Sequence, residues 1–296
     1  MAQRGIDVVR AHLAKLPPSE SLTIEQRRAQ YDAAERVFPT PADVAIERVT
    51  APTRPAEWLT PPGPSRDAVV LYLHGGGYVI GSPRSHRHLT AAVAQASGTR
   101  ALLLDYRLAP EHPFPAALED AVAAYDWLLG QGLGPRRVVI AGDSAGGGLT
   151  VATLLALRDR GRPLPAAGVC ISPWVDLTCS GASYTSKAAV DPIVARESVL
   201  MMAKAYAGAG DPKNPLVSPL HANLSGLPPL LVHVGSDEVL LDDALGLAEQ
   251  ARRAGVKVTL EEWPAMIHVW HWFQPMLEEA ERATAAIGAF VRAHTG

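Results

Sequence analysis

Short apolar runs alternate with longer amphipathic stretches along most of the 296-residue chain. The short runs are rich in Val, Leu and Ile, as buried strands are, and lie at residues 44–50, 68–73, 100–104, 138–141, 167–171, 230–234 and 256–262. Stretches typical of helices fall between them, at residues 89–96, 116–129, 149–160, 242–254 and 273–293. Near-continuous apolar strands separated by helices predict a mostly parallel sheet with helices on both faces.

Two segments fall outside this alternation. Residues 1–42 contain helix patterns at 6–15 and 24–38, and residues 184–215 contain a further one. We therefore predict one α/β domain over residues 43–296, with 1–42 and 184–215 as helical segments outside its layers. The alternative is a terminal helix pair docked on the domain and an ordinary insertion in a crossover.

Residues 142–146 are Gly-Asp-Ser-Ala-Gly and lie between a predicted strand and a predicted helix. They fit G-x-S-x-G, the pattern of a tight turn that exposes a serine hydroxyl where a strand passes into a helix. Glycines on both sides remove Cβ atoms that would clash in such a turn, and the first amides of the helix favour negative charge beside the hydroxyl. The pattern alone also fits an ordinary glycine-rich connection. We interpret Ser144 as the candidate nucleophile.

A glycine run, His-Gly-Gly-Gly-Tyr at residues 74–78, follows the predicted strand at 68–73. Acyl transfer by a serine requires amide donors aimed at the oxygen that becomes negative in the tetrahedral intermediate. In lipases and esterases, an HGGG-type loop and the residue after the nucleophile supply such donors. This assigns the oxyanion hole to Gly76, Gly77 and Ala145. A phosphate-binding loop of the G-x-x-x-x-G-K-[ST] type would need a lysine, and the run contains none.

A serine nucleophile also needs a base and a group that orients the base. In α/β-hydrolases the order along the chain is serine, acid, histidine. Asp237 follows the run at 230–234, and His268 follows the run at 256–262. The three residues can meet only if the strands between them lie in one sheet.

Nearby residues compete for both roles. Glu238 and Asp242 are alternatives for the acid, but Asp237 comes first after the strand, where a side chain can reach back to the histidine. His271 is the alternative base, three residues beyond His268. The two histidines could form a metal pair, but a catalytic zinc needs a third protein ligand and no H-E-x-x-H pattern is present. We therefore predict Asp237 as the acid, His268 as the base and no metal.

The other histidines and the two cysteines receive structural interpretations. His86 and His88 lie near a predicted helix start and are expected to be exposed, whereas His233 lies inside a predicted strand as a hydrogen-bonded core residue. Cys170 falls in a strand pattern and Cys179 in the following loop. Two cysteines do not make a disulfide framework, although a bridge between them is the alternative.

These motifs together resemble those of the hormone-sensitive-lipase-like α/β-hydrolases, in the bacterial esterase branch with Gly-Asp-Ser-Ala-Gly. The likeness covers residues 66–294 and includes the segment at 105–117, Ser-Pro-Trp at 172–174 and Ser-Pro-Leu at 218–220. The family often has Asp-Pro-Leu at the acid, where this chain has Asp-Glu-Val at 237–239. The resemblance implies an α/β-hydrolase fold of about eight strands, ester hydrolysis through an acyl-enzyme, and no cofactor.

In that family, segments corresponding to residues 1–42 and 184–215 form a helical cap over the active site. Under such a cap, the candidates to line the substrate pocket are Tyr78, Trp174, Met202, Tyr206 and Trp270. Methionine suits an adaptable apolar pocket, but it is also ordinary core filler. Family members often pair through the edge strand near residues 256–262, which predicts a homodimer.

The resemblance predicts a carboxylesterase that acts on a small-molecule ester with a short- to medium-chain acyl group. An amidase or peptidase could use the same triad. The family also resembles certain plant hormone receptors that bind ligands without catalysis and in which the histidine is replaced, whereas His268 is present here.

Composition narrows the choice of partners and compartment. The net charge is −3 and 19% of residues are charged, so the chain lacks the basic footprint of a nucleic-acid-binding protein. The N-terminus carries Arg4, Asp7 and Arg10 without the apolar core of a signal peptide. We therefore predict no signal peptide, no membrane span and a cytoplasmic location.

Overall fold

The computed structural model describes residues 5–15, 22–63, 67–274 and 276–296. Within these residues, eight strands form one sheet in the order β1-β2-β4-β3-β5-β6-β7-β8. β2 runs antiparallel to both of its neighbours, and all other pairs are parallel. The strands are β1 (Ala45–Thr50), β2 (Pro55–Thr60), β3 (Val69–Leu73), β4 (Arg100–Leu104), β5 (Val138–Asp143), β6 (Ala167–Ile171), β7 (Leu230–Gly235) and β8 (Val258–Trp263).

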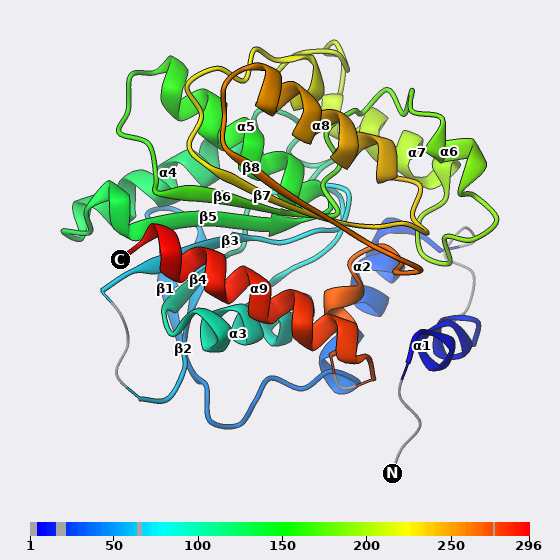
Figure 1. Ribbon diagram of the computed structural model, residues 1–296, viewed down its shortest axis with the longest axis horizontal. Coiled ribbons are helices and arrows are strands. Elements are labelled where there is room, and N and C mark those ends of the chain that lie inside the picture. The colour runs from blue at the N-terminus through cyan, green and yellow to red at the C-terminus, as the bar shows by residue number, and fades with distance from the viewer. Residues whose placement is uncertain (1–4, 16–21, 64–66, 275) are drawn as a thin grey trace.

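Helices cover both faces of this sheet, as predicted (Figure 1). One face carries α3 (Pro83–Ser97) and α9 (Glu278–His294), and the other carries α4 (Ala116–Gly130), α5 (Ala145–Asp159) and α8 (Leu241–Arg253). Successive side chains of a strand point to opposite faces. In β3, therefore, Leu71 and Leu73 join the core beneath α5, while Val70 and Tyr72 join the core beneath α3 and α9.

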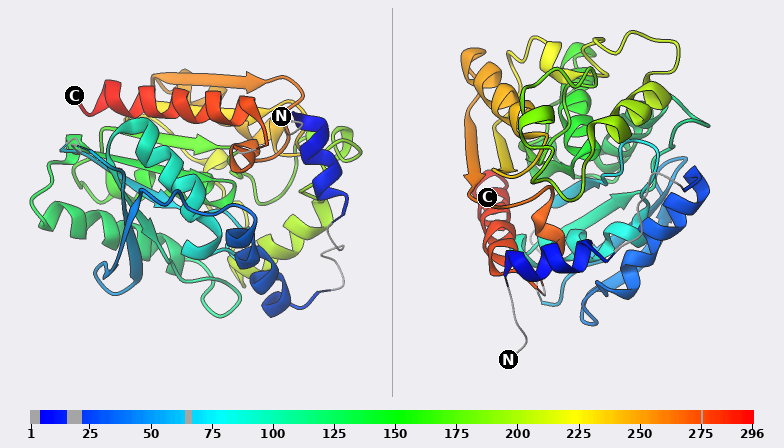
Figure 2. Two further views of the ribbon diagram at one scale, coloured as in Figure 1. Left: turned by 90° about the horizontal axis from the view of Figure 1, so that it is seen from below. Right: turned by 90° about the vertical axis from the view of Figure 1, so that its right-hand side faces the viewer.

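The smaller helices α1, α2, α6 and α7 gather at the end of the molecule toward which the parallel strands point (Figures 1 and 2). They are α1 (Ile6–Leu13), α2 (Ile24–Asp32), α6 (Ser183–Ser186) and α7 (Arg196–Ala207). Four 3-10 turns complete the described elements, η2 (Ala33–Arg36), η3 (Pro135–Arg137), η4 (Pro219–His221) and η5 (Trp270–Phe273). In the described parts of the chain, every helix is too short or too polar to cross a bilayer.

Helix α3 begins six residues earlier than the pattern at 89–96 predicts. Ser82 accepts a hydrogen bond from the Arg84 amide at 3.1 Å, and Ser85 accepts one from the Ser82 amide at 3.0 Å. This capping box, with a proline at the first helical position, fixes the start of the helix. The longer helix carries His86 and His88 into the interior, so the prediction that they are exposed is wrong.

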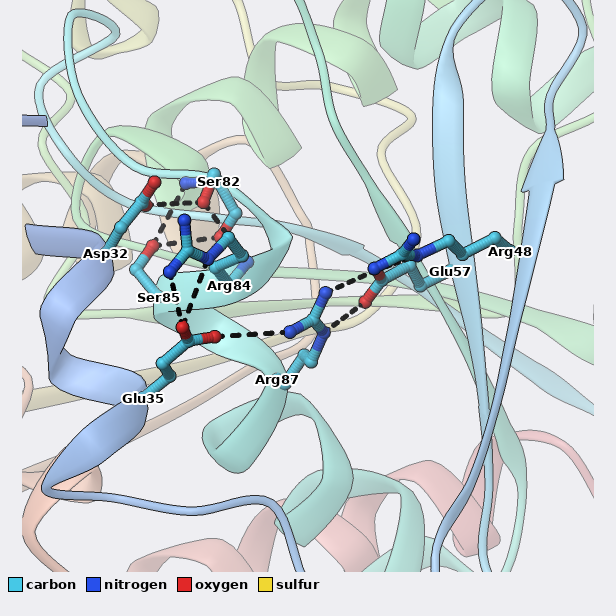
Figure 3. A network of polar contacts seen from close by, with 8 residues as sticks. All are labelled: Asp32, Glu35, Arg48, Glu57, Ser82, Arg84, Ser85 and Arg87. Atoms are coloured by element: carbon cyan, nitrogen blue, oxygen red, sulfur yellow. Dashed lines mark hydrogen bonds and ion pairs between the residues drawn. The ribbon is translucent and has the colours of Figure 1, made fainter. Parts of the chain in front are cut away.

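Strand β2 was not among the runs predicted from the sequence, because a charged residue interrupts its apolar pattern. Glu57 is nevertheless buried, and Arg87 of α3 donates to both of its carboxylate oxygens at 2.5 and 2.6 Å. Figure 3 shows that this pair belongs to a polar network, which continues from Arg87 to Glu35 of η2 and from there to Arg84. The network ties β2 and the N-terminal segment to α3.

Candidate active site

The nucleophile candidate sits in a strained turn between β5 and α5. Ser144 has φ 53° and ψ −121°, in the left-handed half of backbone space that residues with a side chain seldom adopt. Its amide donates to the Ile171 carbonyl at 2.8 Å, and its carbonyl accepts from the Trp174 amide at 2.9 Å. A Cβ atom on Gly146 would lie 1.9 Å from the Leu73 carbonyl oxygen. The glycine therefore lets the turn pack directly against the end of β3.

The glycine loop follows β3 and lies beside this turn. A Cβ atom on Gly75 would meet the Asp143 carboxylate at 2.2 Å, and one on Gly76 would meet the Ile80 carbonyl oxygen at 2.2 Å. Gly76 has φ 116° and Gly77 has φ 59°, which favour glycine for a second reason. Among the described residues, nothing accepts a hydrogen bond from the amides of Gly76 or Gly77. Two amide donors are thus free in this loop.

Ala145, the third predicted donor, is the first residue of α5. The first amides of an α-helix have no partner within the helix, and the positive end of the helix dipole lies at the same place. The turn therefore places Ser144 at a helix end suited to negative charge.

The histidine predicted as the base contacts a different acid from the one predicted. His268 Nδ1 lies 2.8 Å from Glu238 Oε2. The other oxygen, Glu238 Oε1, accepts from the Gly235 amide at 2.5 Å and from Ser172 Oγ at 2.9 Å. Ser172 Oγ in turn accepts from the Val269 amide at 3.1 Å. Glu238 is fully buried, and both of its carboxylate oxygens have hydrogen-bonding partners.

Asp237 points away from the histidine. Its Oδ2 pairs with Arg10 of α1 at 2.9 Å, and its side chain is 26% exposed. β7 ends at Gly235 and the chain turns at residues 236–237. After this turn, Glu238 is the residue that faces His268, and its side chain is one methylene longer than that of Asp237. The structure thus places Glu238, and not Asp237, as the partner of His268. Asp242, the other alternative, accepts from the Ser183 amide.

The environment of His268 suits a base. Burial lowers its pKa, but the hydrogen bond to Glu238 and the negative charge of that carboxylate raise it more. The negative charges of Asp191 and Asp143 also raise this pKa, by less. The net effect raises the pKa of His268 above 6.5. The imidazolium that forms when a base takes a proton is therefore stabilised here.

A buried polar network centred on Asp143 contacts the glycine loop. Asp143 Oδ1 accepts from the Tyr72 hydroxyl at 2.9 Å and from the Gly75 amide at 3.2 Å, and Asp143 Oδ2 lies 3.3 Å from His86 Nε2. Burial raises the pKa of Asp143, but His86 and the hydrogen bonds lower it more, and the net direction is down. Asp143 therefore connects the turn that carries the serine to the loop that carries the amide donors.

Four of the five predicted pocket residues lie together. The rings of Tyr78 and Tyr206 stack with centroids 3.7 Å apart, and Trp174 lies 6.0 Å from Tyr78. Met202 packs on the glycine loop, since a Cβ atom on Gly77 would be 2.1 Å from its sulfur. These side chains from α7 and from the loops after β3 and β6 form an apolar cluster next to the candidate oxyanion hole.

Trp270 does not join this cluster. It is fully buried in the core on the other face of the sheet, where its ring lies 6.3 Å from His233 and 5.7 Å from Trp263. The prediction that it lines the same pocket is therefore wrong. His271 packs there too, with Nε2 3.1 Å from His233 Nδ1, and burial, together with the electrostatic effect of the neighbouring His233, lowers the pKa of His271 well below 6.5. His233 is a core histidine, as predicted.

Glu238 was one of two alternatives to Asp237 in the sequence, and Ser172 had no individual role predicted for it. The two adjacent acidic residues at 237 and 238 were the sequence signal for Glu238. A serine that donates to a buried carboxylate, as Ser172 does, has no sequence motif of its own. Cys170 and Cys179 are both free and buried. Among the described residues, no three His, Cys, Asp or Glu side chains are grouped so that they could hold a metal ion.

Comparison with known proteins identifies the family to which this fold belongs. Residues 70–272 match a family model described as an alpha/beta hydrolase fold. The chain is 50% identical to an acetyl-hydrolase of Streptomyces hygroscopicus, over 100% of this chain and 99% of that protein. It is 36% identical to the putative acetyl-hydrolase LipR of Mycobacterium tuberculosis, over 97% and 94%. A crystal structure of an esterase from the bacterial hormone-sensitive lipase family superposes with TM-score 0.94 at 50% identity, covering 98% of each chain.

Proposed function

The chain belongs to the α/β-hydrolase family, among the carboxylesterases of the bacterial hormone-sensitive lipase type, and from this premise we propose that it cleaves short-chain acyl esters with Ser144, His268 and Glu238. The observation that carries the triad is the 2.8 Å contact between His268 Nδ1 and Glu238 Oε2. Because Nδ1 makes this contact, Nε2 is the nitrogen available to accept the proton of the Ser144 hydroxyl.

In the proposed reaction, His268 Nε2 takes the Ser144 hydroxyl proton while the serine oxygen attacks the ester carbonyl carbon. The amides of Gly76, Gly77 and Ala145 donate to the resulting oxyanion. When the tetrahedral intermediate collapses, the C–O bond to the alcohol breaks and the alcohol leaves with the proton from His268. Water then attacks the acyl-enzyme by the same route, which releases the carboxylic acid and restores the serine.

We propose a short acyl group because of the apolar cluster beside the glycine loop. The Met202 sulfur lies 2.1 Å from where a Cβ atom on Gly77 would be, and the stacked rings of Tyr78 and Tyr206 lie next to the same loop, so we expect little room for a long acyl chain. Two relatives carry the name acetyl-hydrolase, and a solved relative at 48% identity was soaked with p-nitrophenyl butyrate. We expect acetyl and butyryl esters to be the best substrates.

We further propose that residues 1–42 and 184–215 act as the cap over this site. In support, α1, α2, α6 and α7 lie at the carboxyl ends of the parallel strands (Figure 1), where ligands of open α/β sheets bind. The cytoplasmic location and a homodimer through β8 stay predictions from the sequence.

The proposal is tested with purified protein and p-nitrophenyl esters of two to sixteen carbons. We expect hydrolysis of the acetate and butyrate, a steep decline beyond about eight carbons, and no activity above background in Ser144→Ala. Activity in Ser144→Ala equal to that of the unmodified protein would remove the serine from the mechanism. A rate that rises toward sixteen carbons would refute the short-chain assignment.

A further inference from the structure

We propose that Arg10 of the N-terminal helix is a positioning residue, which holds the loop that carries the catalytic acid at its place beside the histidine. This inference rests on the proposed function, because it assigns to Arg10 an effect that passes through Glu238.

Arg10 joins two segments that are far apart in sequence. One guanidinium nitrogen, Nη2, pairs with Asp237 Oδ2 at 2.9 Å, and the other, Nη1, donates to the Val190 carbonyl at 2.7 Å. Asp237 directly precedes Glu238, and Val190 lies in the segment at 184–215. A planar guanidinium can serve two acceptors in fixed directions, which a lysine ammonium does less well.

The residue on the other side of Glu238 is held by the same segment and by the residue directly before that segment. The Val239 amide donates to Asp191 Oδ2 at 2.9 Å, and the Val239 carbonyl accepts from Ser183 Oγ at 2.6 Å. Asp191 is itself fixed, because its Oδ1 accepts from the Ile193 and Val194 amides. Both neighbours of Glu238 are therefore tied to elements outside the sheet.

Helix α1 gives Arg10 a fixed base. Val9, one residue earlier, is fully buried in the core shared with α9, and Ile6 and Leu13 pack against that core. The Gly5 amide donates to the Met276 carbonyl at 2.8 Å. Figures 1 and 2 together show α1 beside the start of α9. The packing of α1 therefore fixes the backbone position from which the Arg10 side chain extends.

Because the Arg10–Asp237 ion pair is partly exposed, its effect on catalysis can be distinguished from its effect on folding stability. The side chains of Arg10 and Asp237 are 30% and 26% exposed, and exposed ion pairs contribute little to folding stability. A misplacement of a reacting group by about 1 Å, in contrast, can lower a rate about 100-fold. Loss of Arg10 should accordingly be visible in kcat and nearly invisible in thermal melting.

The experiment compares Arg10→Ala, Asp237→Ala and the double variant, with p-nitrophenyl butyrate as substrate. We expect each single variant to lose about 5- to 20-fold in kcat, with KM within about twofold. The double variant should lose no more than either single one, because residues acting through one contact are not additive. Arg10→Lys, which keeps the charge but not the fork, should fall between Arg10→Ala and the unmodified protein.

Arg84→Ala is the matched control. Arg84 also pairs with a carboxylate, that of Glu35, and its side chain is 51% exposed, but its contacts lie in the network of Figure 3 and not at the acid loop. This variant should keep kcat. The positioning role is refuted if Arg10→Ala keeps its kcat, if Arg84→Ala loses as much, or if the Arg10 and Asp237 losses multiply in the double variant.

Two further variants separate this inference from the proposed function. Ser144→Ala and Glu238→Gln are assayed in the same series, and both should be nearly inactive if the triad is correct. Full activity in Glu238→Gln would overturn the triad itself. Inactivity in Glu238→Gln combined with full activity in Arg10→Ala would overturn only the role of Arg10.

Discussion

The glycine loop offers a test in which geometry distinguishes neighbouring glycines. At Gly76 a Cβ atom would lie 2.2 Å from the Ile80 carbonyl oxygen, which belongs to the backbone of the same turn. The turn is closed by the Ile80 amide, which donates to the Gly76 carbonyl at 2.9 Å. Gly76→Ala therefore cannot be accommodated by a side-chain movement, and the loop must shift.

A shift of the loop moves the amide donors away from the oxyanion. Loss of one such donor costs about 3 to 4 kcal/mol of transition-state stabilisation, or about 100- to 1000-fold in kcat. At Gly77 the obstacle is the sulfur of Met202, 2.1 Å from the added Cβ atom. Because that side chain is flexible, we expect Gly77→Ala to lose less activity than Gly76→Ala, and Met202→Ala to restore part of it.

Gly132→Ala controls for the backbone strain. Gly132 has φ 90° and nothing within 4 Å of an added Cβ atom, so the substitution introduces an unfavourable dihedral angle in a remote turn. We expect it to lower the melting temperature and leave kcat unchanged. The assay is kcat on p-nitrophenyl butyrate, with a thermal melt of each variant to show that it is folded. A folded Gly76→Ala protein with kcat within threefold of the unmodified value would refute the oxyanion assignment.

Two more predictions follow from the environment of the site. A base must be neutral to accept a proton, and the pKa of His268 is raised, so kcat/KM should fall on the acid side with a midpoint above pH 6.5. Loss of the Glu238 charge should move that midpoint to lower pH. An unchanged midpoint for the residual activity of Glu238→Gln would contradict Glu238 as the cause of the raised pKa. Met202→Ala should raise the ratio of octanoate to acetate hydrolysis by about 5- to 50-fold, as measured by kcat/KM on both esters, and an unchanged ratio would show that Met202 does not limit the acyl group.

The features that sequence reasoning predicted correctly are those with a local physical signal. The strand-to-helix turn around Ser144 requires glycines at fixed places, and a run of glycines after β3 marks the loop beside it. The parallel sheet follows from apolar runs that alternate with helices. These signals lie within a few residues of one another, so a single sequence is enough to detect them.

The features that it predicted wrongly depend on contacts between distant segments. Asp237 and Glu238 are neighbours, and only the course of the turn after Gly235 decides which one faces His268. Trp270 is close to His268 in sequence, yet the turn at η5 carries it to the opposite face of the sheet. In β2, the buried Glu57 is tolerated because Arg87 of α3 pairs with it, and no pattern within the strand indicates that partner.

The most direct test of the account compares two amide substitutions at adjacent positions, Glu238→Gln and Asp237→Asn. Both remove one carboxylate charge, but only Glu238 contacts His268, while the partly exposed Asp237 pairs with Arg10. We predict that Glu238→Gln lowers kcat on p-nitrophenyl butyrate by about 1000-fold or more, and that Asp237→Asn lowers it by no more than about 10-fold. A loss of that size in Asp237→Asn, with Glu238→Gln nearly as active as the unmodified protein, would contradict the account.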